Sequence, residues 1–220
     1  MSAVKVAYPP NPQAEQMVRQ QLRARGISSE RVLQVMSCLP RHSFVSGGHR
    51  GEAYGDFPLP IGRGQTISQP YMVGLMTEEL QLRGGERALE VGTGSGYQTA
   101  VLAELAAEVY TVELIPSLLE RASALLDELG YRNVRYRAGD GSAGWAEEAP
   151  FDAVLVAAAS AGIPEALTAQ LADNGVLVIP VGRTQAYQTL VTVRRRGRRL
   201  ERRDGIGCRF VPLVQEPGAD

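Results

Sequence analysis

The chain has 220 residues, 44% hydrophobic and 21% charged, a composition that suits one soluble α/β domain with its own core. Its formal net charge of −1 gives no global field that would favour nucleic acid or an acidic membrane. No apolar run approaches the ~18 residues of a membrane helix, and the N-terminus lacks the apolar run of a signal peptide. We expect a cytoplasmic monomer with no membrane or nucleic-acid partner.

The two cysteines, Cys38 and Cys208, lie far apart in the chain and form no CxxC pattern. This spacing is typical of small buried side chains in a reducing compartment, and it favours neither a disulfide nor a metal pair. We therefore expect no metal site.

The first 40 residues predict two helices behind a flexible, proline-rich lead-in over 1–12. The first helix covers 13–25 and ends before Gly26, a natural residue for a helix C-terminus. The second begins after Ser29, which can cap it, and ends at Pro40.

Residues 40–70 are rich in glycine and proline and show no sustained periodicity. A structureless stretch of this length inside a compact domain is usually functional or wrongly assigned. A helical pattern resumes over 70–82.

From residue 86 onward, short apolar segments alternate with helical ones. The predicted strands are 87–91, 109–113, 134–137, 151–157 and 176–180, and the predicted helices are 97–107, 116–129 and 164–172. Such alternation predicts a parallel sheet that is covered on both faces. Two further strands are predicted at 190–195 and 200–213, joined by a polar turn. This pattern indicates an antiparallel edge to the sheet. The fold class is a doubly wound, Rossmann-like α/β sheet with additional N-terminal helices.

A glycine-rich segment, Gly92-Thr93-Gly94-Ser95-Gly96, follows one apolar strand and precedes a helix. Glycines in such a turn let the backbone approach a ligand that a Cβ would exclude. Glu113 ends the next predicted strand, where its carboxylate can accept hydrogen bonds from both ribose hydroxyls. Asp140 and Gly141 follow the third strand, where an acidic side chain can meet an adenine amino group. These elements predict a nucleotide-like ligand at the strand ends.

Tyr97 separates two classes of ligand for this turn. The dinucleotide fingerprint has Gly or Ala at this position, so that the helix can pack close to the strand. Tyr97 therefore argues against a nicotinamide-dependent oxidoreductase and favours S-adenosylmethionine. A non-catalytic module that keeps the cofactor fold is a further alternative, although Ser68, Glu113 and Asp140 are all intact.

Beyond the turn, the chain resembles the protein-L-isoaspartate (D-aspartate) O-methyltransferase family from about Met17 to Leu213. The resemblance is carried by residues 40–45, 53–54, 58–70, 89–97, 139–141, 144–145, 149–152 and 209–213. Residues 64–70, Gly-Gln-Thr-Ile-Ser-Gln-Pro, are highly specific to that family, whereas many methyltransferases share the glycine turn.

The resemblance implies methyl transfer from S-adenosylmethionine to the free α-carboxylate of L-isoaspartyl and D-aspartyl residues in damaged peptides and proteins. The products would be S-adenosylhomocysteine and an ester that closes to a succinimide, whose hydrolysis returns some normal aspartate. It also implies that Ser68 is catalytic. We predict cofactor contacts from Gly92, Thr93, Gly94, Ser95, Gly96, Glu113, Asp140, Gly141, Gln69 and Gln188, and substrate contacts from Thr66, Ile67, Ser68 and His42.

Some points stay open at the level of the sequence. His42 can equally be a structural histidine, hydrogen-bonded within the 40–45 turn. Ser46 replaces an expected proline, and Ala157 begins an Ala-Ala-Ala-Ser run where members often carry Thr or Gly-Ala-Ala, beside the expected acceptor pocket. A methyltransferase of the same fold dedicated to one peptide substrate remains an alternative.

The chemistry expected at the site is simple. The acceptor carboxylate has a pKa near 4, so it is an anion at pH 7 and needs no general base. Catalysis must then come from holding its oxygen in line with the methyl group, with Ser68 as a hydrogen-bond donor. A nucleic-acid methyltransferase is disfavoured, because no Asn/Asp-Pro-Pro-aromatic motif follows residues 151–157. The arginine run 194–199 is interpreted as a solvated hairpin tip.

We expect one domain over 1–220. Within it, residues 13–85 would hold the N-terminal helices and the substrate and cofactor loop, 86–180 the cofactor-binding core, and 181–220 the C-terminal strands.

Overall fold

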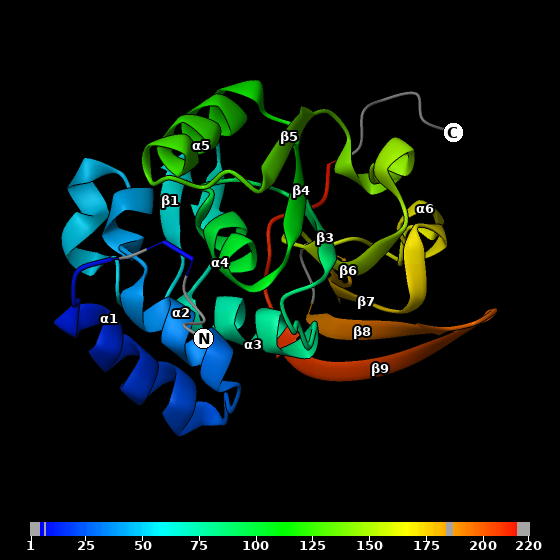
Figure 1. Cartoon of the computed structure of the whole chain (residues 1–220), viewed down its shortest axis with the longest axis horizontal. Coiled ribbons are helices and arrows are strands. Elements are labelled where there is room, and N and C mark those ends of the chain that lie inside the picture. The colour runs from blue at the N-terminus through cyan, green and yellow to red at the C-terminus, as the bar shows by residue number, and fades with distance from the viewer. Residues whose placement is uncertain (1–4, 7, 184–186, 215–220) are drawn as a thin grey trace.

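The computed structural model describes residues 5–6, 8–183 and 187–214 and is built around a seven-stranded sheet (Figure 1). The strand order is β5-β4-β3-β6-β7-β8-β9, in which the first five strands are parallel and the last two antiparallel. The strands are β3 Arg87–Val91, β4 Glu108–Glu113, β5 Val134–Ala138, β6 Phe151–Val156, β7 Leu171–Val181, β8 Gln188–Arg196 and β9 Arg199–Cys208. The predicted fold class, including its antiparallel edge, is confirmed.

Both faces of the parallel part are covered, because successive side chains on a strand point to opposite faces. On β6, Ala153 and Leu155 face one core while Val154 and Val156 face the other. The first core is shared with α3 Pro70–Glu79, α4 Tyr97–Leu105, α5 Pro116–Glu128 and the N-terminal helices, and the second with α6 Glu165–Ala169. Proline at the first position of α3 and α5 suits these starts, since its missing N–H would be unpaired there.

The strand order reverses in the middle of the sheet, between β3 and β6, and this reversal positions the site. From β3 the chain continues to β4 and β5 on one side, and it then returns to β6, beside β3. Open α/β sheets bind ligands at such a reversal, outside the carboxyl ends of the strands.

The N-terminal region differs from its prediction in two respects. The expected helix over 13–25 is α1 Pro12–Met17 followed by a π-helical turn, Val18–Leu22, and a 3-10 turn, Arg23–Arg25, before Gly26. The lead-in over 1–12, predicted to be flexible, bonds the rest of the chain where it is described. The Tyr8 hydroxyl bonds that of Tyr131 at 2.9 Å, and the Lys5 backbone N–H donates to Glu104. Residues 1–4 and 7 lie outside the described part. The second helix, α2 Glu30–Cys38, follows Ser29 as predicted, although the Ser29 side chain makes no cap.

Residues 40–70 are not a structureless loop. They contain 3-10 turns at Arg41–Phe44 and Gly47–Glu52 and an antiparallel hairpin of β1 Leu59–Gly62 and β2 Gln65–Ile67. The hairpin was missed because its strands are only four and three residues long, too short for a sustained alternation.

Two predicted boundaries near the C-terminus are wrong. The helix expected over 164–172 ends at Ala169, because β7 begins at Leu171 with an irregular register against Phe151. The strand expected over 200–213 ends at Cys208, after which the chain leaves β9 and Pro212 pairs with Ala159.

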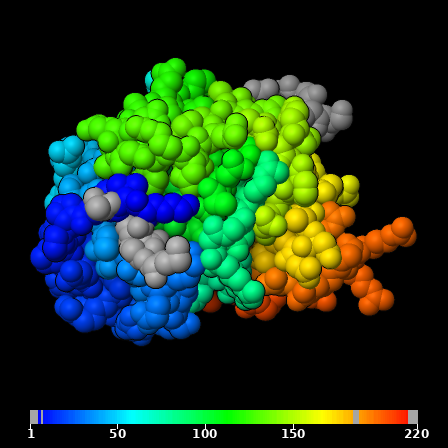
Figure 2. All heavy atoms as spheres, in the orientation of Figure 1, coloured from blue at the N-terminus to red at the C-terminus, as the bar shows by residue number. Residues whose placement is uncertain are grey.

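The β8–β9 hairpin projects from the body of the molecule (Figure 2). Most arginines near its tip bond groups of the chain itself: Arg195 donates to the Leu171 carbonyl at 2.8 Å, and Arg196 bonds Asn174. Residues 196–199 are exposed, which fits the solvated-tip interpretation, whereas Arg194 and Arg195 are half-buried. Cys38 and Cys208 are free and half-buried, which is less burial than expected. In the described ranges, no helix combines the length and apolar character needed to cross a membrane.

Candidate functional site

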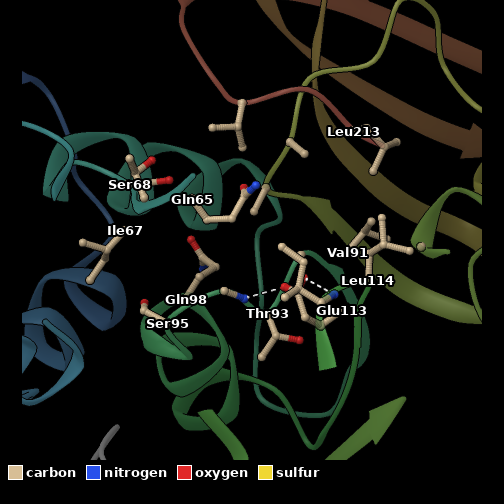
Figure 3. A pocket seen from close by; sticks show the side chains of 18 of the residues that line it. Gln65, Ile67, Ser68, Val91, Thr93, Ser95, Gln98, Glu113, Leu114 and Leu213 are labelled. Atoms are coloured by element: carbon tan, nitrogen blue, oxygen red, sulfur yellow. Dashed lines mark hydrogen bonds between the residues drawn. The ribbon is translucent and has the colours of Figure 1, made fainter. Parts of the chain in front are cut away.

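A pocket opens at the carboxyl ends of β3, β4 and β6, at the reversal of the strand order (Figure 3). Segments far apart in the sequence meet there: strand β2 with Ser68 (the 65–68 loop), the glycine turn after β3, the end of β4, Gly141 after β5, residues 157–158 after β6, and the C-terminal segment 211–214. Its lining is Gln65, Thr66, Ile67, Ser68, Val73, Val91, Gly92, Thr93, Gly94, Ser95, Tyr97, Gln98, Val112, Glu113, Leu114, Ile115, Gly141, Ala157, Ala158, Val211, Pro212, Leu213 and Val214.

The glycine turn has the backbone shape that its sequence requires. Gly92, Gly94 and Gly96 have φ angles of 94°, 53° and 84°, in the left-handed region that favours glycine. At Gly96 a Cβ would also lie 3.2 Å from the Ala122 side chain, so α5 packs close to the turn. All five residues of the predicted segment lie in or beside the pocket; four of them line it, and Gly96 supports the turn from behind.

Glu113 ends β4 and is almost fully buried beside the turn. Its Oε2 accepts the Gly94 N–H at 2.8 Å and its Oε1 accepts the Ile115 N–H at 2.9 Å. A carboxylate offers about four acceptor positions, and these two bonds occupy one on each oxygen. Glu113 therefore shapes the turn and keeps acceptor capacity on both oxygens toward the pocket.

Asp140 and Gly141, both predicted as cofactor contacts, differ in their position relative to the pocket. Gly141 lines the pocket and packs so closely on Val91 that a Cβ would lie 2.4 Å from the Val91 side chain. Asp140 is the preceding residue and is absent from the lining; its Oδ1 accepts the Ser142 N–H at 2.7 Å and so caps a short 3-10 turn. The predicted adenine contact of Asp140 stays a prediction.

The 65–68 loop brings the predicted acceptor residues to the same pocket. Thr66, Ile67 and Ser68 line it, and Ile67 and Ser68 lie opposite the glycine turn (Figure 3). Gln69 lies just outside, in a smaller hollow that it shares with Thr66 and Ser68 and with the C-terminal segment at 209–211. This hollow adjoins the main pocket through Ser68, so the loop separates two compartments.

His42 is not brought to either compartment. Its Nδ1 lies 2.7 Å from the Tyr54 hydroxyl, and the two rings are 5.9 Å apart. The Tyr54 hydroxyl also accepts from Asn11 at 2.5 Å. This setting fits the structural alternative for His42, and its substrate contact remains a prediction.

Gln188, predicted as a cofactor contact, is fully buried at the start of β8 and does not line the pocket. Its Nε2 donates to the Phe210 carbonyl at 3.0 Å, and its Oε1 accepts the Phe210 N–H at 2.6 Å. Ala159 holds the next residues by bonds to the Val211 carbonyl, 2.8 Å, and the Leu213 N–H, 2.7 Å. Gln188 thus secures the C-terminal wall of the pocket.

Tyr97 fills the space between the glycine turn and the N-terminal region. It is fully buried, with its ring 5.4 Å from that of Phe44 and 4.7 Å from the Arg41 guanidinium carbon. The helix therefore packs on a large aromatic group where a dinucleotide fold would bring it close to the strand.

Sequence reasoning missed Glu90, the last-but-one residue of β3. Its Oε2 accepts hydroxyl bonds from Thr99, 2.6 Å, and Thr111, 2.7 Å, while its Oε1 has no partner in the part of the chain described. Burial raises the pKa of this carboxyl to about 8. An acidic residue inside an apolar strand is a visible signal, but only the fold shows how completely it is enclosed.

Comparison with known proteins places the chain in a family. The model of "Protein-L-isoaspartate(D-aspartate) O-methyltransferase (PCMT)" matches residues 12–218. A protein-L-isoaspartate O-methyltransferase of Trichlorobacter lovleyi is 51% identical over 205 residues, 93% of this chain and 94% of that protein. A protein-L-isoaspartate O-methyltransferase 2 of Geotalea uraniireducens is 55% identical over 203 residues, 92% of this chain and 93% of that protein.

Solved structures agree with the sequence relatives. One protein-L-isoaspartate O-methyltransferase superposes with a TM-score of 0.82 at 26% identity, covering 91% of this chain and 66% of that one. A candidate member from Plasmodium falciparum, in complex with S-adenosyl-L-homocysteine, gives 0.80 at 25% identity, with 93% and 100% covered. The chain belongs to the protein-L-isoaspartate (D-aspartate) O-methyltransferase family, as its sequence motifs predicted.

Proposed function

We propose that this protein transfers a methyl group from S-adenosylmethionine to the free α-carboxylate of L-isoaspartyl and D-aspartyl residues in damaged proteins. The observation that carries the proposal is the position of Ser68. This residue lies in the wall of the pocket that also contains the glycine turn and Glu113. A hydroxyl donor and a nucleoside-binding arrangement therefore share one pocket, as a transfer between two bound molecules requires.

The residues of the pocket fit an adenosyl cofactor. The free acceptor positions of Glu113 suit two ribose hydroxyls, while Val91, Leu114 and Ile115 supply an apolar surface for a planar base. When bound, S-adenosylmethionine supplies an electrophilic methyl group on a positively charged sulfur.

The chain itself has to orient the acceptor. Because the acceptor carboxylate is already ionised at pH 7, no side chain has to remove a proton. The Ser68 hydroxyl can donate a hydrogen bond to one carboxylate oxygen and leave the other directed at the methyl group. Ile67, Ala157 and Val211 line the same pocket with apolar surface, which would exclude water from this position once both ligands are bound.

The acceptor peptide would enter from the side of the 65–68 loop that faces away from the glycine turn. The hollow beside Ser68 continues there into a groove whose lining includes Pro58, Gln69, Tyr71 and Phe210. We assign this groove to the residues that flank the isoaspartyl group.

The test is methyl transfer from labelled S-adenosylmethionine to three matched peptides that contain isoaspartate, aspartate or D-aspartate at one position. We expect label in the isoaspartyl peptide, less in the D-aspartyl peptide and none in the aspartyl peptide. Transfer to the ordinary aspartyl peptide alone would favour the same-fold enzyme dedicated to one peptide substrate. Tight binding of a nicotinamide dinucleotide without binding of S-adenosylhomocysteine would refute the assignment altogether.

Replacing Ser68 tests its role within this reaction. A Ser68→Ala variant should bind S-adenosylhomocysteine within about threefold of the parent and lose at least about tenfold in turnover, since one charge-assisted hydrogen bond is removed. Parental turnover on the isoaspartyl peptide would remove Ser68 from the mechanism.

Partners and location extend the same proposal. Isoaspartyl-containing peptides and proteins are the expected partners. We expect a cytoplasmic monomer, and light scattering with and without S-adenosylhomocysteine tests the oligomeric state.

A further inference from the structure

Arg41 is a fully buried arginine that bonds backbone carbonyls. Its Nε donates to the Ala53 carbonyl and its Nη2 to the Ser68 carbonyl, each at 2.7 Å. No carboxylate bonds this guanidinium among the residues described; Asp56 acts on it only through space. A buried arginine is ordinarily paired with an acidic group, so this arrangement is costly for the fold alone.

Burial lowers the pKa of Arg41 to about 10, which still leaves the side chain charged at neutral pH. The charge is balanced in part by the Tyr97 ring, whose centroid lies 4.7 Å from the guanidinium carbon. Tyr97 is the first residue of α4, directly after the glycine turn. The Arg41 side chain thus contacts Ala53, Ser68 and Tyr97, the residue at which the glycine turn ends and α4 begins.

We propose that Arg41 is a positioning residue for methyl transfer, which fixes the Ser68 hydroxyl relative to the glycine turn by holding the Ser68 carbonyl. The inference rests on the proposed function, because it acts through Ser68. Ser68 lies between β2 and α3, outside both elements, where the regular bonds of a strand or helix do not set its direction. Its hydroxyl direction therefore depends on the peptide plane to which Arg41 donates.

The planar guanidinium explains why the position is an arginine. Its Nε and Nη2 lie in one rigid fork and reach two carbonyls in fixed relation to each other. A lysine would keep the charge but carry its donors on one rotating ammonium, which cannot reproduce that relation. Arg41→Lys is therefore the informative change.

The experiment is a double-mutant cycle of Arg41→Lys and Ser68→Ala, with turnover on the isoaspartyl peptide expressed per site that binds S-adenosylhomocysteine. We expect Arg41→Lys to lower kcat by about tenfold or more, with the affinity for S-adenosylhomocysteine within about threefold of the parent. In the Ser68→Ala background the same change should cost less than about twofold, since residues that act together are not additive. Equal losses in both backgrounds would overturn the inference.

A matched control is Arg87→Lys. Arg87 also lies over an aromatic ring, that of Tyr110 at 4.9 Å, but it begins β3 at the opposite end of the strand from the turn. This variant should keep parental turnover per site even if it is less stable. If it lost turnover as Arg41→Lys does, a general effect of arginine replacement would explain both results and refute the inference.

Folding is checked by circular dichroism and by the fraction of sites that bind S-adenosylhomocysteine. If Arg41→Lys does not fold, the neutral Arg41→Gln takes its place in the cycle, since it removes the buried charge and keeps one amide donor. Failure of both to fold would assign Arg41 to the fold alone and refute the inference. If Ser68→Ala kept parental turnover, the role proposed for Ser68 would be refuted. If Ser68→Ala lost turnover but the effects of the two substitutions were additive, only the role of Arg41 would be refuted.

Discussion

The carboxylate of Glu113 bonds the backbone at two residues of the pocket lining, Gly94 and Ile115. It therefore has two tasks, to hold the turn in shape and to present acceptors to the ligand. A glutamine has one acceptor oxygen only, and its NH₂ would face one of these two N–H groups.

From this we predict that Glu113→Gln weakens binding of S-adenosylhomocysteine by about 10- to 100-fold, which corresponds to about 1.4–3 kcal/mol. Isothermal titration calorimetry measures the change. The control is Glu108→Gln at the opposite end of β4, where Glu108 pairs with Arg87 on the surface. Equal affinity of Glu113→Gln and the parent would refute the ribose role.

Glu90 gives the fold a specific dependence on pH. Its pKa is raised from 4.5 to about 8, mainly by burial, so between these values the folded chain binds a proton that the unfolded chain has released. This contribution to stability is complete below about pH 4.5 and is lost as the pH rises to about 8.

We therefore predict that Glu90→Gln, which mimics the neutral acid, flattens the fall in unfolding free energy between pH 5 and 8. The change should reach a few kcal/mol at most, since one pKa unit is about 1.4 kcal/mol. Urea unfolding at a series of pH values measures it. Parallel pH profiles of the variant and the parent would show that Glu90 is not the group responsible.

At the scale of elements, the segment after β9 forms a wall of the pocket without belonging to a strand. Gln188 holds Phe210 with both ends of its amide, and Ala159 bonds the two sides of Pro212. Loss of the Gln188 side chain would leave the Phe210 N–H and carbonyl without these partners. Each unpaired group costs up to about 1–3 kcal/mol of stability, the upper end applying to full burial, whereas Phe210 is partly buried.

We predict that Gln188→Ala lowers the unfolding free energy by about 2 kcal/mol or more and raises KM for the peptide, while S-adenosylhomocysteine still binds. Denaturant unfolding and steady-state kinetics measure the two effects. The opposite result, a loss of cofactor affinity with unchanged stability, would support the cofactor contact that the sequence had predicted for Gln188.

At the scale of the whole molecule, one hydrophobic core runs from Ala14 in α1 to Leu190 in β8. Leu22 shows the connection: it is fully buried and packs against Gly74 of α3, where a Cβ would lie 3.0 Å from its side chain. The N-terminal helices are therefore part of the same core as the sheet, which favours the single domain expected over 1–220.

We predict one cooperative unfolding transition that Leu22→Ala shifts as a whole, with a loss of about 2–5 kcal/mol. Far-ultraviolet circular dichroism and the fluorescence of Trp145, the one tryptophan and a neighbour of the second core, should give the same midpoint. Leu200→Ala on the exposed hairpin is the control and should change little. Separate midpoints would mean that the N-terminal region unfolds on its own.

Most of the sheet could be predicted because each buried strand carries a short apolar run between turn residues, and this signal is local. The hairpin at 59–67 could not, since its strands are too short to show alternation and their pairing depends on packing. The lead-in was also misjudged, because a run of prolines indicates a break in helix or strand but not whether Tyr8 finds Tyr131.

The sequence by itself determined the fold class, the family and the ligand-binding turn, because hydrophobic period, glycine spacing and strand-end carboxylates are properties of neighbouring residues. Only the tertiary structure decided which distant residues share the site. It enclosed Glu90, turned Gln188 toward Phe210 and placed Arg41 on the Ser68 carbonyl. These outcomes depend on which side chains and unpaired backbone groups meet when segments far apart in the chain pack together, and the pattern of nearby residues does not contain that information.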